Sequence, residues 1–141
     1  MQKQKIYLEH ANITVSNLKK SLHFFKTAFP TFTVRGGDEK EWLHFGDDYT
    51  YIALTQGSLG GGKPNGPNYD EVGLSHLGFV VDDVKTVSAN LLAAGYKRNF
   101  PTTLEKYRCR EYFLDNDGNE YEFVEYFSDT IAERNSYDAV I

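Results

Sequence analysis

Two histidines, His10 and His76, occupy the same place in a repeated segment, where an imidazole could contact a ligand. Residues 8–15 read Leu-Glu-His-Ala-Asn-Ile-Thr-Val, and residues 74–81 read Leu-Ser-His-Leu-Gly-Phe-Val-Val. Strict alternation in both copies separates an apolar set from a second set that contains the histidine. A period of two is typical of a strand with one face on a core. Histidine, asparagine and threonine are poor core residues, so the second face is available for another role.

Each repeated segment is followed by a predicted helix and three further strands. Asn17 can cap the first helix, which Pro30 ends, and strands follow at 31–35, 42–45 and 51–56. The apolar face of this helix has spacings of four, three and four: Leu18, Leu22, Phe25 and Phe29.

The second half repeats this order after a loop at 57–71 that is rich in Gly, Pro and Asn. Asp82 and Asp83 suit a helix start, and Gly95 suits its end. The apolar face of this helix is predicted from Val84, Val87, Leu91 and Leu92. Strands are predicted near 96–99, 108–114 and 120–127.

These elements predict an α+β fold of two βαβββ modules within a single domain, residues 1–141. The first module spans about 5–56, the second about 72–127, and a polar tail covers 128–141. Each module should bury one sheet face under its helix. The opposite faces would then line a shared concave surface.

Composition and charge exclude several functional classes. The chain has 141 residues, is 40% hydrophobic and carries a net charge of −5, so nothing favours nucleic acid as a partner. No apolar run approaches the roughly 20 residues that span a bilayer, and no signal-peptide pattern is present. The single cysteine, Cys109, excludes an internal disulfide and a cysteine-based zinc site. We therefore expect a cytoplasmic protein that does not bind membranes.

Three segments together resemble the vicinal oxygen chelate superfamily of glyoxalases, fosfomycin-resistance transferases, extradiol dioxygenases and bleomycin-binding proteins. Two of them are the histidine segments, each with its helix. The third, residues 112–122, reads Tyr-Phe-Leu-Asp-Asn-Asp-Gly-Asn-Glu-Tyr-Glu. It is similar to the family's F-x-D-P-D-G-N-x-x-E ending, with Asn116 where proline is usual. The resemblance covers residues 6–127 and implies an open half-barrel cup that holds one divalent metal ion.

The resemblance implies that His10, His76 and Glu122 are the metal ligands. Two imidazoles and a carboxylate suit Mn, Fe, Co, Ni or Zn and leave positions open for a bidentate oxygen substrate. The strand pattern agrees, because Tyr121 and Phe123 should face the helix and Glu122 the cup.

A fourth ligand depends on how the two halves are aligned. Equal spacing would make Gln56 the counterpart of Glu122. Alternation along the strand instead makes Ala53 the counterpart, with Gln56 on the helix side. We expect the second alignment to hold, and a longer turn at 115–119 than at 47–48 would absorb the difference.

Substrate contacts are predicted on the cup face around the ion. Tyr112 matches a substrate-contacting tyrosine of the fosfomycin transferases, although the chain departs from them around 102–106. A lactoylglutathione lyase usually uses four ligands. No catalytic residue is identified, and the candidate substrate-binding residues are Tyr112, Arg110, Arg108, His44, Asn12 and Tyr51.

The resemblance therefore predicts a metal-dependent lyase, isomerase or transferase acting on a small oxygen-rich molecule that chelates the ion. One alternative is a metal-free small-molecule binding protein of the bleomycin-resistance type. Another is a non-haem iron extradiol dioxygenase. The resemblance also implies a homodimer, because short two-module chains of this superfamily commonly pair.

Overall fold

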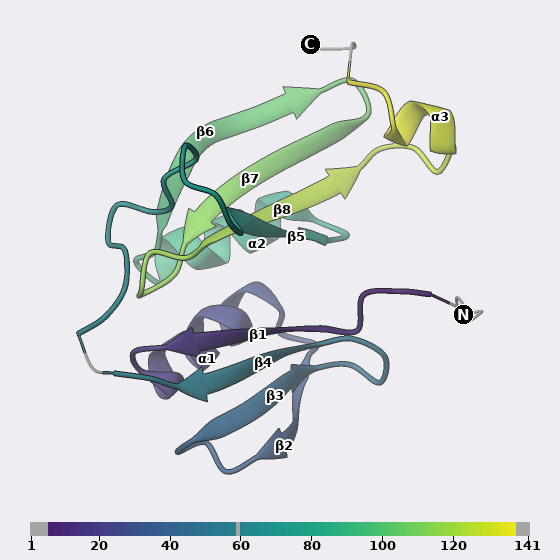
Figure 1. Cartoon of the computed structure of the whole chain (residues 1–141). Helices are drawn as coiled ribbons and strands as arrows, with labels where there is room; N and C mark the ends of the chain where they lie inside the picture. The colour runs from purple at the N-terminus through teal and green to yellow at the C-terminus, as the bar shows by residue number, and fades with distance from the viewer. Residues whose placement is uncertain (1–5, 59, 138–141) are drawn as a thin grey trace. The chain divides into compact units, whose positions relative to one another are not determined.

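The computed structural model describes residues 6–58 and 60–137, and the chain divides into two compact units between Gly61 and Gly62. Each unit is described here by itself. Both have the order βαβββ, with four strands in one sheet, as Figure 1 shows. The predicted α+β fold of two βαβββ modules is confirmed.

The first unit has the strand order β1-β4-β3-β2, with β1 parallel to β4 and the other pairs antiparallel. Its elements are β1 (His10–Val15), α1 (Leu18–Ala28), β2 (Thr33–Gly37), β3 (Trp42–Gly46) and β4 (Tyr51–Gln56).

The second unit has the equivalent strand order β5-β8-β7-β6, again with its first and last strands parallel. Its elements are β5 (His76–Val80), α2 (Val84–Ala93), β6 (Lys97–Glu105), β7 (Arg108–Leu114), β8 (Glu120–Tyr126) and a short α3 (Ile131–Arg134). Helix α3 lies in the polar tail, whereas residues 138–141 at the end of that tail lie outside the described residues.

The two long helices begin where their capping side chains predict. The Asn17 side chain accepts a hydrogen bond from the Lys20 N–H at 3.0 Å, and Asp83 does the same for Thr86 at 3.0 Å. Gly95 follows α2 with a φ of +91°, a left-handed conformation that favours glycine. These caps fix where each helix starts over its sheet.

The core of each unit lies between its helix and one face of its sheet. Helix α1 contacts β3 and β4, and α2 contacts β7 and β8. Tyr121 and Phe123 are buried on the helix side, as alternation along β8 predicts, and this leaves Glu122 on the opposite face. The polar face of each sheet is therefore the one that carries the candidate site residues.

Strand register decides which residues of the two units are equivalent. In the first unit Asn12 pairs with Ala53, and in the second Gly78 pairs with Glu122. Asn12 and Gly78 are equivalent in the repeat, so Ala53 is the counterpart of Glu122. This is the alignment that alternation predicts.

The segment that joins the units contacts the β7–β8 turn of the second unit. The Lys63 N–H donates a hydrogen bond to the Asp117 carbonyl. Gly118 has a φ of +80°, and a Cβ there would overlap the Lys63 carbonyl oxygen. The turn therefore needs glycine at this position for two reasons. Within the described residues, no helix is long and apolar enough to cross a membrane.

Candidate metal centre and substrate pocket

His76 and Glu122 lie together on the polar face of the second unit. They come from the parallel neighbours β5 and β8, and His76 Nε2 is 3.2 Å from Glu122 Oε2. Gly78 lies directly opposite Glu122, where a Cβ would come 3.6 Å from that oxygen. This is an ordinary van der Waals distance, so position 78 does not hinder the carboxylate from facing the imidazole.

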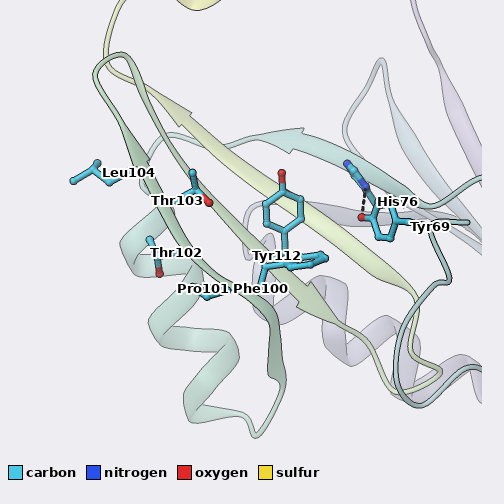
Figure 2. A pocket seen from close by; sticks show the side chains of 8 residues that line it. All are labelled: Tyr69, His76, Phe100, Pro101, Thr102, Thr103, Leu104 and Tyr112. Carbon is cyan, nitrogen blue, oxygen red and sulfur yellow. Dashed lines mark hydrogen bonds between the residues drawn. The ribbon is translucent and has the colours of Figure 1, made fainter. Parts of the chain in front are cut away.

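The other ring nitrogen of His76 is held by a relay of hydrogen bonds. The Tyr69 hydroxyl donates to Glu120, so its oxygen can accept from the His76 Nδ1–H, 3.0 Å away (Figure 2). Asn99 Nδ2 donates to the second Glu120 oxygen. Burial and the bond to Glu120 raise the pKa of Tyr69, so the phenol keeps its proton at neutral pH. The relay therefore places the imidazole proton on Nδ1.

A proton on Nδ1 leaves Nε2 with a lone pair that faces the Glu122 carboxylate. Two electron-rich atoms at 3.2 Å repel unless a cation or a second imidazole proton is present. Ion–ligand bonds of about 2.1 Å place neighbouring ligands about 3.0–3.4 Å apart, so the spacing fits two ligands of one ion. No group of three or more His, Cys, Asp or Glu side chains is gathered for an ion within the described residues.

His10 has a similar arrangement within the first unit. Its Nδ1 is 2.9 Å from Glu9 Oε1, and because a carboxylate can only accept, Nδ1 is the donor. The ring stacks on Tyr51 with centroids 4.8 Å apart and planes 11° apart. The Tyr51 hydroxyl donates to the same Glu9 oxygen at 3.4 Å. Glu9 and Tyr51 thus orient the His10 ring and leave the lone pair on Nε2.

His44 continues this row of rings on the first sheet. It stacks on Tyr51 at 4.4 Å between centroids, and Trp42 lies at 4.9 Å. Burial lowers the pKa of His44, so its imidazole is neutral at pH 7. In strand register His44 pairs with Ala53 as Tyr112 pairs with Glu122. The polar-face placement predicted for His44 is therefore observed within its own unit.

Asn12 is exposed on the same sheet and accepts a hydrogen bond from the Thr55 hydroxyl at 3.1 Å. Arg35 lies over the Tyr51 ring, with its guanidinium carbon 4.4 Å from the centroid. Both belong to the polar face of the first unit.

Tyr112 lies beside His76 in the second unit, with the two ring centroids 5.6 Å apart. Burial and the charge of Glu122 raise the pKa of Tyr112, so its hydroxyl is protonated at neutral pH. Arg110 Nη1 donates to that hydroxyl at 3.2 Å and Nη2 donates to Glu105 at 3.0 Å. The Tyr112 hydroxyl thus accepts from Arg110 and also forms a hydrogen bond with Glu122, which links it to the candidate metal ligand.

Arg108 is placed differently from its expected role at the substrate. It is 1% exposed and pairs with Glu105 at 2.9 Å. It also donates to the carbonyls of Arg134 and Ser136, and its guanidinium carbon lies 4.1 Å from the centroid of the Tyr137 ring. The strand face was predicted correctly, but the segment after β8 folds back onto this end of β7. These contacts give Arg108 a role in packing the C-terminal segment.

Gln56 is the last residue of β4, and its side chain lies at the start of α1. Its Oε1 accepts from the Leu18 N–H at 2.9 Å, and its Nε2 donates to the Ser16 carbonyl at 2.7 Å and the Gly57 carbonyl at 2.9 Å. Glu125 makes the equivalent bond to the Val84 N–H at 2.9 Å. Alternation along β4 thus predicts its position better than equal spacing does.

A cavity of about 750 Å³ opens beside His76 in the second unit. Figure 2 shows Phe100 and Tyr112 close together in this pocket, with Tyr69 and His76 beside them. Sequence reasoning missed Tyr69 and Phe100. Tyr69 is the one aromatic residue of the polar loop 57–71, which is a signal that could have found it. The lining residues are Tyr69, His76, Phe100, Pro101, Thr102, Thr103, Leu104 and Tyr112.

Paired βαβββ units, each with a histidine on its first strand, define a fold class shared with known proteins. The chain belongs to the Glyoxalase/Bleomycin resistance protein/Dioxygenase superfamily, whose profile matches residues 7–123. A comparison with curated proteins found no match.

Solved structures of this class resemble the chain in fold. A glyoxylase/bleomycin resistance protein/dioxygenase domain from Frankia sp. EAN1pec is 20% identical, covers 87% of this chain and 99% of its own, and has a TM-score of 0.68. The fosfomycin resistance protein FosX from Mesorhizobium loti is 17% identical, covers 95% of this chain and 100% of its own, and has a TM-score of 0.66. A glyoxalase family protein from Bacillus cereus is 15% identical, covers 91% of this chain and 99% of its own, and has a TM-score of 0.71. At these identities the likeness shows the fold alone.

Proposed function

We propose that the protein is a metal-dependent enzyme that acts on a small molecule with adjacent oxygen atoms. The observation that carries this proposal is the approach of His76 Nε2 to Glu122 Oε2 at 3.2 Å, with the imidazole proton held on the opposite nitrogen. A divalent cation bound by both atoms would satisfy this pair of electron-rich groups. His10 is the third ligand that the family resemblance implies. Glu9 holds the proton of the His10 ring on Nδ1, which leaves the lone pair on Nε2.

The roles of the chain's own groups follow from their contacts. His76 and Glu122 would hold the ion, and Tyr69 and Glu120 would keep the His76 ring in place. Tyr112 would contact the substrate beside the ion. When bound, a divalent ion of Mn, Fe, Co, Ni or Zn would supply Lewis-acid stabilisation of negative charge on the substrate. This chemistry suits a lyase, isomerase or transferase.

Metal binding by variants tests the proposal. Isothermal titration calorimetry with Mn²⁺, Ni²⁺ and Zn²⁺ should show binding by the wild-type protein. Glu122→Gln and His76→Ala should weaken that binding more than about tenfold, because each removes a ligand. Glu71→Gln makes the same chemical change on an exposed loop residue and should leave the affinity unchanged.

Two outcomes would overturn the proposal. A wild-type protein that binds none of these ions at micromolar concentration would favour the metal-free binding protein of the bleomycin-resistance type. Equal affinities for wild type and Glu122→Gln would mean that the ion binds elsewhere. Oxygen consumption with a catechol and Fe²⁺ would indicate the dioxygenase alternative.

A further inference from the structure

The pocket beside His76 carries aromatic side chains that the metal centre does not require. The Phe100 ring contacts Tyr112 edge-on with centroids 5.4 Å apart, and Tyr69 lies at 6.0 Å on its other side. Tyr112 in turn contacts His76. Rings with these edge-to-face contacts form an apolar surface that continues up to the candidate metal ligand (Figure 2).

Irregular pairing in β6 turns Phe100 towards this pocket. The register between β6 and β7 shifts once between Arg98 and Phe100 and again between Phe100 and Thr103, and Pro101 lies within the second shift. Bulges of this kind redirect a side chain and are common beside functional sites. As a result Phe100 pairs with Tyr112 and is 42% exposed, and Leu104 at the far end is 48% exposed.

The pocket is lined by aromatic, aliphatic and hydroxyl side chains beside His76. Its described lining contains no Arg, Lys, Asp or Glu side chain. The guanidinium of Arg110, which bonds to the Tyr112 hydroxyl, already pairs with Glu105 at 3.0 Å. Away from the candidate metal ligand, the pocket therefore offers no charged side chain to pair with a phosphate, phosphonate or carboxylate group. The surface suits a neutral, flat, apolar group.

We propose that the substrate carries an uncharged aromatic ring, which binds between Phe100, Tyr112 and Leu104, next to a pair of adjacent oxygens. The oxygen pair rests on the proposed function, because the ion held by His76 and Glu122 would bind it. The ring site rests only on the pocket. The substrate class is therefore an aryl compound with vicinal oxygens rather than a small anion such as fosfomycin.

Two hydroxamates that differ only in their side group test the ring site. Benzohydroxamate and acetohydroxamate offer the same two chelating oxygens, but the first carries a phenyl ring and the second a methyl group. Calorimetry with the metal-loaded protein should show benzohydroxamate binding about tenfold more tightly, as burial of a ring predicts. Phe100→Ala should abolish this preference while acetohydroxamate affinity changes by less than about twofold.

Matched variants make the result specific. Phe127→Ala removes another half-exposed ring of the second unit, outside the pocket lining, and should keep the tenfold preference. Equal binding of the two hydroxamates by the metal-loaded wild type would overturn the proposal. So would a Phe100→Ala variant that loses affinity for both ligands equally.

Metal-free protein separates this inference from the proposed function. Benzamide carries the ring but does not chelate, and its titration should move the NMR resonances of Phe100 and Tyr112. If the protein binds no metal but benzamide moves these resonances, the proposed function fails and the ring site stands. If benzamide leaves them in place, the ring site is overturned, whatever the metal measurements show.

Discussion

At the scale of single residues, the candidate centre depends on which nitrogen of each histidine carries the proton. A carboxylate faces Nδ1 of His10 directly, and a tyrosine joined to a carboxylate faces Nδ1 of His76. The two units therefore hold the Nδ1 proton of their histidine with different residues. Glu9 precedes β1, whereas Tyr69 comes from the connecting loop and Glu120 from β8.

Glu9 offers a clean test of this orientation because it is exposed and its loss should not unfold the protein. Glu9→Gln keeps the shape of the side chain but weakens its hold on the Nδ1 proton of His10. We expect about a tenfold loss in affinity for the divalent ion, measured by calorimetry, as for other residues that orient metal ligands. Glu41→Gln, an exposed control, should have no effect. An unchanged affinity in Glu9→Gln would show that Glu9 does not orient a ligand.

Individual residues differ in how far the sequence predicts them. Alternation along a strand is enough to place Glu122 opposite Tyr121 and Phe123, and the structure agrees. The burial of Arg108 was not predictable from alternation, because its partners lie in the segment after β8. Tyr69 lies in a loop that has no period to read, so its contact with His76 appears only in three dimensions.

At the scale of elements, a side chain near the end of β4 and one near the end of β8 connect each last strand to its helix. Gln56 accepts from the first helical N–H of α1, and Glu125 does the same for α2. The helix starts are therefore fixed by the sheet as well as by Asn17 and Asp83. This interaction explains why Gln56 faces the helix and not the polar face.

We expect Gln56→Ala to destabilise the protein by about 1–2 kcal/mol, because the Leu18 N–H and two carbonyls lose a partner. Urea unfolding measures this loss. Gln56→Glu should lose at least as much, because its second carboxylate oxygen would face the Ser16 and Gly57 carbonyls to which Nε2 now donates. Metal affinity should stay unchanged in both variants. A large loss of metal affinity in Gln56→Ala with stability intact would instead make Gln56 a ligand.

Element boundaries follow the sequence closely except at β6. Asn17, Asp83 and Gly95 mark the helix ends as predicted, because caps and left-handed glycines depend on local chemistry. The strand predicted at 96–99 instead extends to Glu105, with two irregularities. Pro101 argues against a regular strand, and only pairing with β7 carries the strand through it.

At the scale of the whole molecule, each described sheet has two edge strands that are paired on one side only within their own unit. Strands β1 and β2 are the edges of the first sheet, and β5 and β6 are the edges of the second. Edges of this kind pair readily with another chain, and closed twofold association is the commonest oligomer. The family resemblance points in the same direction.

We therefore predict a homodimer. Light scattering coupled to gel filtration should give twice the mass of the 16.1 kDa chain. The measurement should be repeated over a tenfold dilution, because a stable dimer keeps its mass while a weak one dissociates. A monomer at the concentration of a crystallisation drop would contradict the prediction.

The contact between Lys63 and the β7–β8 turn limits where extra residues can be inserted into this chain. Only glycine fits at position 118, because the Lys63 carbonyl lies where a side chain would be, so residues added beside Lys63 would disrupt this contact with the turn. A Cβ at Gly60 would meet nothing within 4 Å, and lengthening an open loop costs little. Insertions in natural variants should therefore occur between Gly60 and Gly61, and an inserted reporter domain should be tolerated there. The few residues that follow, up to Lys63, should not vary in length.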